Sequence, residues 1–128
     1  MNTKGFSDEQ KSALLDLLIL GMYQDRHIAA AEDDRIKSLL ASFDLPSDYA
    51  RQQFIDASFA RVNRQQRTPE AIRSAVFAYA SKFNDAKQRK EALDALAELL
   101  ASDSRVTSEE DRFLAMVQEA LELKPGHS

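Results

Sequence analysis

The chain has 128 residues, 44% of them hydrophobic and 30% charged, which suits one domain with an apolar core of its own. It contains no cysteine, which excludes disulfides, thiolate metal sites and a cysteine nucleophile, and which fits a cytoplasmic location. The net charge of −4 is unevenly distributed, with −4 over residues 1–50, +6 over 51–90 and −6 over 91–128. The N-terminal residues do not resemble a signal peptide, and the apolar run at 17–23 is too short to span a bilayer. We therefore expect a soluble protein.

The residue usage predicts an all-α fold. Ala, Leu, Glu, Lys, Arg and Gln dominate, and these residues lose little rotamer freedom in a helix. The three glycines and three prolines lie near expected boundaries or ends. We expect a single domain over 1–128, a compact bundle of six to seven helices with a core of about 10–122 and a tail at 123–128.

Two helices are predicted in the first third of the chain. The "SDEQ" segment at 7–10 is a capping box, in which the serine hydroxyl and the glutamine side chain each bond a backbone amide. Apolar residues from Leu14 to Met22 then recur at the spacing of one buried helical stripe. A second helix is expected over about 30–43, and the "DLPSD" segment at 44–48 should end it, because the residue before a proline avoids helical angles.

Four more helices are predicted after this break. The third should end at the "RQQRTPE" segment, 64–70, where the threonine can cap a fourth helix and Pro69 suits its first position. We expect this fourth helix to bury Phe77. A fifth should start within 84–87, and a sixth at the second capping box, "TSEE" at 107–110. The residues expected to be buried together are Leu15, Leu18, Ile36, Leu39, Leu96, Leu99, Leu114 and Val117.

One acidic pattern occurs twice, with an offset of 78 residues. The "QDRHIAAAED" segment at 24–33 aligns with "SDSRVTSEED" at 102–111, so that Asp25 falls over Asp103. Both copies read D-x-x-[IV]-x-x-x-E-D, follow an apolar helix and lead into apolar residues at helical spacing. The sequence therefore predicts two pseudo-repeated helical hairpins, each with an acidic corner between its helices.

These corners and their flanking helices resemble the TerB family of tellurite-resistance proteins, whose relatives include the N-terminal region of DnaJ-like membrane co-chaperones. The resemblance covers roughly 10–122. It implies a helical binding or scaffolding module linked to tellurite, envelope or metal stress. In members of this family the corner usually has the sequence ADG-x-[IV]-x-x-x-E. In this chain Arg26 and Ser104 replace the glycine. Glycine there usually serves a left-handed turn, so this chain is expected to be a divergent member.

The resemblance also implies that the two corners meet at one end of the molecule, where they could bind a divalent cation. The candidate metal ligands are Asp25, Glu32, Asp33, Asp103, Glu110 and Asp111. No cofactor can be assigned with certainty from the sequence. The candidate is calcium or another divalent cation, because calcium accepts six to eight oxygen ligands in flexible geometry. Helix capping is the simpler explanation, because carboxylates in a first turn stabilise the helix dipole and turn aspartates accept amide hydrogen bonds.

The basic middle of the chain suggests a different function. Its candidate anion-binding or partner-binding residues are Arg61, Arg64, Arg67 and Arg73. Such a stripe could meet nucleic acid, an anionic membrane surface or an acidic partner. The nearby aromatic residues fall at core spacing, however, so a solvated face explains the charges more simply. We therefore expect an unidentified protein partner or a second copy of the chain rather than nucleic acid or membrane. No nucleophile stands beside a base and no Gly-rich phosphate loop occurs, so we predict a protein that is not an enzyme.

Overall fold

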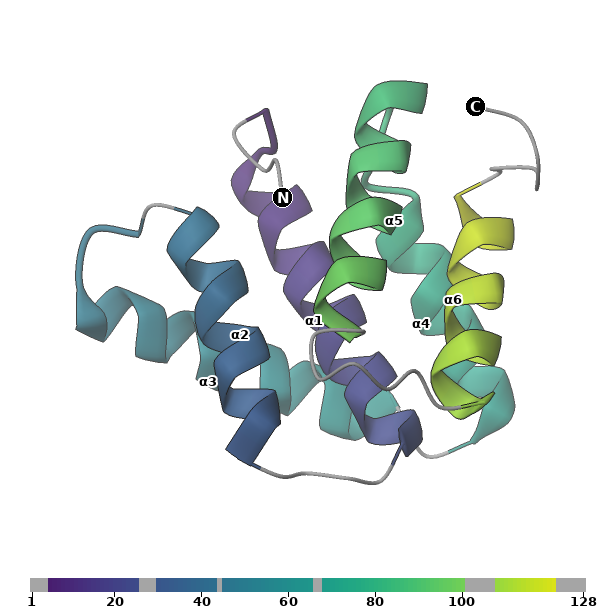
Figure 1. The fold of residues 1–128 in the computed structure, drawn as a ribbon, viewed down its shortest axis with the longest axis horizontal. Helices are drawn as coiled ribbons and strands as arrows, with labels where there is room; N and C mark the ends of the chain where they lie inside the picture. The colour runs from purple at the N-terminus through teal and green to yellow at the C-terminus, as the bar shows by residue number, and fades with distance from the viewer. Residues whose placement is uncertain (1–4, 26–29, 44, 66–67, 101–107, 122–128) are drawn as a thin grey trace.

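The computed structural model describes residues 5–25, 30–43, 45–65, 68–100 and 108–121, without the side chains of 24–25, 30–35, 65 and 110. The described residues form six α-helices and no strand (Figure 1). The helices are α1 (Asp8–Asp25), α2 (Ala30–Ser42), α3 (Asp48–Gln65), α4 (Pro69–Ala80), α5 (Ala86–Leu100) and α6 (Ser108–Ala120). The predicted all-α bundle is confirmed.

Helix α1 is the central element of the bundle, because it contacts each of the other helices (Figure 1). Its apolar side chains are buried on every side rather than along one stripe, so the predicted single stripe was too narrow. The buried apolar residues of α1 are Ala13, Leu14, Leu15, Leu17, Leu18, Ile19, Leu20 and Met22. A helix that is apolar all round is stable only when it is covered all round. The other five helices supply that cover.

The predicted starts of α1 and α4 are confirmed, whereas the second predicted capping box, Thr107 with Glu110, lies outside the described side chains. The Ser7 backbone N–H donates to Gln10 Oε1 at 2.9 Å, and the Gln10 N–H donates to Ser7 Oγ at 3.2 Å, which is the reciprocal capping box expected at α1. At α4, Thr68 Oγ1 accepts a hydrogen bond from the Ala71 N–H at 3.0 Å, and Pro69 occupies the first helical position.

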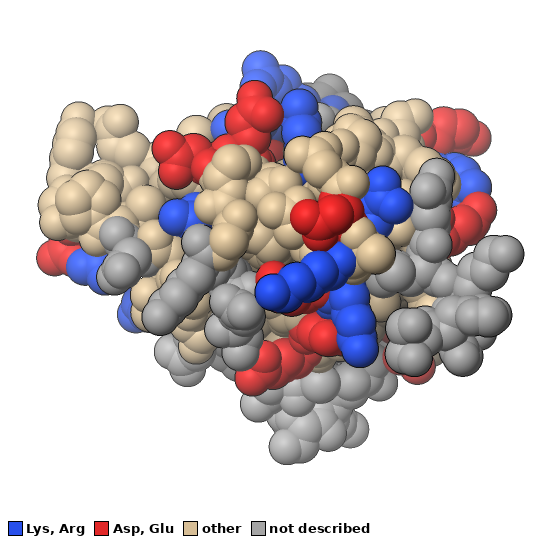
Figure 2. Space-filling view, turned by 90° about the horizontal axis from the view of Figure 1, so that it is seen from above, with Lys and Arg blue, Asp and Glu red and all other residues tan. Residues whose placement is uncertain are grey.

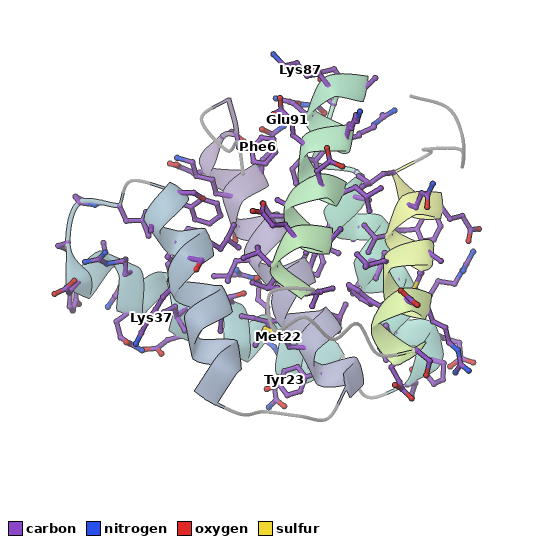
Figure 3. All side chains as sticks on the ribbon, viewed as in Figure 1. Phe6, Met22, Tyr23, Lys37, Lys87 and Glu91 are labelled. Atoms are coloured by element: carbon purple, nitrogen blue, oxygen red, sulfur yellow. The ribbon has the colours of Figure 1, made fainter. Side chains whose placement is uncertain are left out.

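The residue before the α1 cap joins the start of α1 to the connection between α4 and α5. Phe6 is buried and meets Phe83 edge to face, with ring centroids 5.2 Å apart (Figure 3). Beside this pair, the Gln10 Nε2 donates to the Lys82 carbonyl at 2.9 Å. Apolar and polar contacts thus hold the same two segments together.

The internal repeat of the sequence is also a repeat of the structure. Adding 78 to the bounds of α2 gives the bounds of α6, and adding 78 to the start of α1 gives the start of α5. The caps correspond as well, because Asp85 Oδ1 accepts from the Gln88 N–H at 2.8 Å as Ser7 Oγ does from the Gln10 N–H. The equivalent glutamines touch one another, with Gln10 Nε2 donating to Gln88 Oε1 at 3.1 Å. The two hairpins therefore correspond in their helix bounds and in their cap residues.

Most of the predicted core is confirmed, but Phe77 of α4 is partly exposed. Leu114 is only partly buried, whereas the other seven residues expected in the core are fully buried. Phe77 was predicted to be buried and is 38% exposed, with the Arg73 guanidinium 4.9 Å from its ring centroid. Tyr79, two positions further along α4, is buried. The reason is that α4 turns its face with Val76, Tyr79 and Ala80 inward, and Phe77 projects from a different side of the helix.

Replacement of Gly21 by alanine tests the contact between α1 and the second hairpin. A Cβ at this position would lie 2.9 Å from two ring carbons of Phe113 and 3.4 Å from Cδ1 of Leu100. We expect Gly21→Ala to lower the free energy of unfolding by up to about 2 kcal/mol, because overpacking costs about 1–3 kcal/mol against a helix-propensity gain of about 1 kcal/mol, and the Phe113 ring that it would meet is itself buried. Urea denaturation measures this change.

The matched control for this variant is Gly5→Ala, because nothing lies within 4 Å of a Cβ added at residue 5. The control should leave the stability within about 0.5 kcal/mol of the wild type. If Gly21→Ala were as stable as the wild type, the packing of α6 on α1 would have to be looser than described.

Candidate functional site

The two acidic corners follow α1 and α5 and precede α2 and α6. In Figure 1, α1 and α5 run towards the lower end of the molecule, and α2 and α6 start from that end. Asp25 is the last residue of α1, Glu32 and Asp33 lie in the first turn of α2, and Glu110 and Asp111 lie in the first turn of α6. The structure describes the exposed side chain of Asp111, whereas Asp103 and the side chains of the other four residues lie outside the described part.

The described side chains do not form a metal site. Among them, no group of three or more His, Asp or Glu residues is arranged so that it could hold an ion. The cation site at the corners therefore stays a prediction. In the described part of the chain, no helix combines the length and the apolar character needed to cross a bilayer.

The four arginines of the basic middle are not equivalent in the structure. Arg64 is exposed in the last turn of α3, and Arg67 lies outside the described residues. Arg73 forms an exposed ion pair with Glu119 of α6, with Nη2 and Oε1 3.0 Å apart. Arg61 is turned inward and paired with a buried carboxylate. On the face seen in Figure 2, Lys and Arg residues are interspersed with Asp and Glu rather than gathered in one patch.

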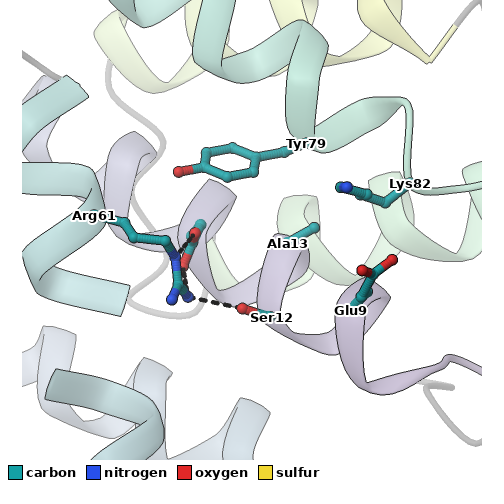
Figure 4. A pocket seen from close by; sticks show the side chains of 7 residues that line it. Glu9, Ser12, Ala13, Arg61, Tyr79 and Lys82 are labelled. Atoms are coloured by element: carbon teal, nitrogen blue, oxygen red, sulfur yellow. Dashed lines mark hydrogen bonds and ion pairs between the residues drawn. The ribbon is translucent and has the colours of Figure 1, made fainter. Parts of the chain in front are cut away.

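The partner of Arg61 is Asp16, a residue that the sequence reasoning did not single out. Asp16 lies on α1 and is 1% exposed. Arg61 Nε donates to Asp16 Oδ2 at 2.7 Å, and Nη2 donates to Oδ1 at 2.9 Å, so the pair is bidentate (Figure 4). The same Nη2 donates to Ser12 Oγ at 2.7 Å, and the Ser58 hydroxyl donates to Asp16 Oδ1. This polar cluster joins α1 to α3 inside an apolar core.

One signal in the sequence could have revealed the cluster. Asp16 is the only charged residue between positions 12 and 24, and apolar residues surround it on both sides. A carboxylate within an apolar run that is buried on all sides needs a cation and further hydrogen bonds. Identifying Arg61 as that cation required the fold, because the two residues are 45 positions apart.

The hydrogen bonds to Asp16 raise the pKa of Arg61 above its ordinary value, although partial burial acts in the opposite direction. A raised pKa means that the folded state stabilises the charged guanidinium. The ion pair therefore makes its full contribution to the free energy of unfolding at any pH below the ordinary pKa of arginine. That stability is lost only when the pH rises through the folded-state pKa, in strong alkali. Arg61 is therefore a fixed charge at neutral pH and does not transfer protons.

A groove of about 250 Å³ opens beside this ion pair (Figure 4). Residues of α1, α3, α4 and the segment after α4 line it. The lining residues are Glu9, Ser12, Ala13, Asp16, Arg61, Tyr79 and Lys82. The groove thus combines a rigid guanidinium, an aromatic wall and two exposed charges.

Neutralising Asp16 tests how much the fold depends on the buried ion pair. Removing one partner of such a pair costs about 3–5 kcal/mol in other proteins. Because the Arg61 side chain is 36% exposed and water can solvate it, we expect Asp16→Asn to lower the free energy of unfolding by about 2–3 kcal/mol. Urea denaturation at neutral pH is the measurement.

The repeat supplies a matched control at Asp94, the residue of α5 that corresponds to Asp16 at the 78-residue offset. Asp94 is exposed, so Asp94→Asn should change the stability by no more than about 0.5 kcal/mol. Equal losses in the two variants would mean that charge rather than burial decides the effect.

The full chain was compared with known proteins. It matches the family described as "Tellurite resistance protein TerB" over residues 11–128, a span that includes both hairpins apart from the first three residues of α1. Searches among curated proteins and among solved structures gave no significant match. Because the family match covers nearly the whole chain and agrees with the repeated helical hairpins, this protein belongs to the TerB family.

Proposed function

We propose that this TerB family member is a non-catalytic cytoplasmic module for binding and scaffolding in the response to tellurite or to envelope and metal stress. In this proposal a divalent cation binds weakly between the two acidic corners, and a protein partner, or a second copy of the chain, recognises the module. The family match supports the link to tellurite resistance.

The observation that carries the cation site is the direction of the helices. Both hairpins descend to the lower end in Figure 1 and rise again from it, so the described helix ends that flank the two corners point to the same end. Helix α1 also contacts both α5 and α6, and α2 contacts α5, so the hairpins pack against one another. Carboxylates from both corners would then supply the oxygen ligands that calcium prefers.

The non-catalytic part of the proposal is supported by the use of the buried polar groups. The Asp16 carboxylate accepts hydrogen bonds from Arg61 and Ser58, and the Gln10 side chain is hydrogen-bonded to backbone and side-chain partners. These groups hold helices together and fix side chains in one position, which suits a rigid recognition domain.

A thermal unfolding experiment tests the cation site. The melting temperature is measured with millimolar calcium, magnesium or zinc chloride and with chelator, for the wild type and for Asp25→Asn/Asp103→Asn. At a cation concentration a hundredfold above Kd, binding to the native state adds about 2.7 kcal/mol, or roughly 10 °C in a domain of this size. We expect a rise in the wild type and none in the double variant.

The control removes two charges elsewhere, with Asp56→Asn/Asp94→Asn on the exposed faces of α3 and α5. This control should keep the full response to the cation. If no cation shifts the wild type while the corner variant melts lower, the carboxylates act as helix caps, and the cation proposal is wrong.

A further inference from the structure

The groove beside Arg61 has the features of a ligand site that is separate from the acidic corners. Glu9, Ala13 and Asp16 line it from successive turns of α1, so it follows α1 for roughly 10 Å at a rise of about 1.5 Å per residue. The Asp16–Arg61 pair lies at one end of this line, and the exposed residues Glu9 and Lys82 lie towards the other (Figure 4). The middle is apolar, formed by Ala13 and the ring of Tyr79.

Arg61 presents unused donors in a fixed orientation. A guanidinium carries five N–H groups, and the bonds to Asp16 and Ser12 engage only those of Nε and Nη2. The two N–H groups of Nη1 have no bond to a described residue, and the Arg61 side chain is 36% exposed. The hydrogen bonds to Asp16 hold the guanidinium still, so a ligand that accepts from Nη1 would lose little free energy to ordering this side chain.

Two cationic side chains, Arg61 and Lys82, line the groove and can donate hydrogen bonds to an anionic ligand. The Asp16 carboxylate is covered and paired with Arg61, so the two charges largely cancel, and Arg61 would hold a ligand through its N–H donors rather than through net charge. Lys82 is exposed, and the Gln10 side chain fixes its backbone carbonyl beside the groove. Lys82 forms no ion pair with any described side chain, Glu9 included, and it is exposed. Glu9 is the one exposed charge that opposes an anion.

We propose that this groove binds a small organic dianion, with one carboxylate held by the Arg61 guanidinium at one end, the other held by Lys82 towards the opposite end, and a short apolar stem between Ala13 and Tyr79. The volume of about 250 Å³ lies below the roughly 300–1,000 Å³ of drug-sized sites, so the ligand is a small molecule. A dicarboxylate with a short chain, such as glutarate, has this chemistry.

An NMR titration of the full chain tests the proposal, with chelator present throughout so that the corners hold no cation. Backbone amide shifts are followed as sodium glutarate, sodium phosphate or sodium chloride is added at constant ionic strength. We expect saturable shifts at Ser12, Ala13 and Lys82 with glutarate and none with chloride. Lys82→Gln should weaken glutarate binding by about tenfold, through the loss of a charged hydrogen bond. Glu9→Gln should tighten it, because it removes the opposing charge.

Two further variants separate the groove from a general charge effect. Lys87→Gln removes the same charge from an exposed position in the first turn of α5 and should leave the affinity unchanged (Figure 3). Arg61→Lys keeps the charge but removes Nη1 and should abolish saturation. Equal weakening by Lys82→Gln and Lys87→Gln, or shifts that never saturate, would overturn the proposal. Saturation by phosphate with no response to glutarate would show that the groove binds an inorganic anion, and the proposal of an organic ligand with an apolar stem would be wrong. The outcome is independent of the corner experiment, which uses cations as chlorides.

Discussion

The burial of α1 on every side is the constraint on which the other contacts of this structure depend. The apolar part of α1, from Ala13 to Met22, needs cover from all directions, and α2 to α6 provide it. The same burial makes Asp16, the single charge within the apolar run, destabilising unless it is paired, because the removal of a carboxylate from water costs several kcal/mol. The bidentate bonds of Arg61 and the Ser58 hydroxyl offset that cost. Helix α3 is therefore attached to α1 by charge as well as by apolar contact.

The two hairpins differ in burial because only α1 packs closely against each of the other helices. Equivalent positions of α1 and α5 carry aspartates, yet Asp16 is buried and Asp94 is exposed. The equivalent cap residues Ser7 and Asp85 both accept a hydrogen bond from the amide three residues on, since a cap depends on its own first turn rather than on the surrounding core. Local features are thus shared by the two copies, and features that depend on burial are not.

The two proposed sites use different parts of α1, which follows from this arrangement. The groove lies along the first half of the helix, from Glu9 to Asp16, and the first acidic corner begins at its last residue, Asp25. A cation at the corners and an organic anion in the groove would be held by separate residues of one rigid helix. Coupling between them would have to pass through α1 and the elements packed on it.

The sequence by itself determined the helices, their caps and the repeat, because these depend on neighbours within three or four positions or on direct comparison of two segments. It also indicated where the acidic corners lie along the chain, although the side chains that would bind a cation are largely outside the described residues. Only the tertiary structure decided which helix is central, that Phe77 faces outward, and that Arg61 belongs to Asp16 rather than to a basic stripe. The physical reason is that periodicity records which residues of a helix are apolar. It does not record how many neighbours cover that helix, or which distant cation reaches a buried carboxylate.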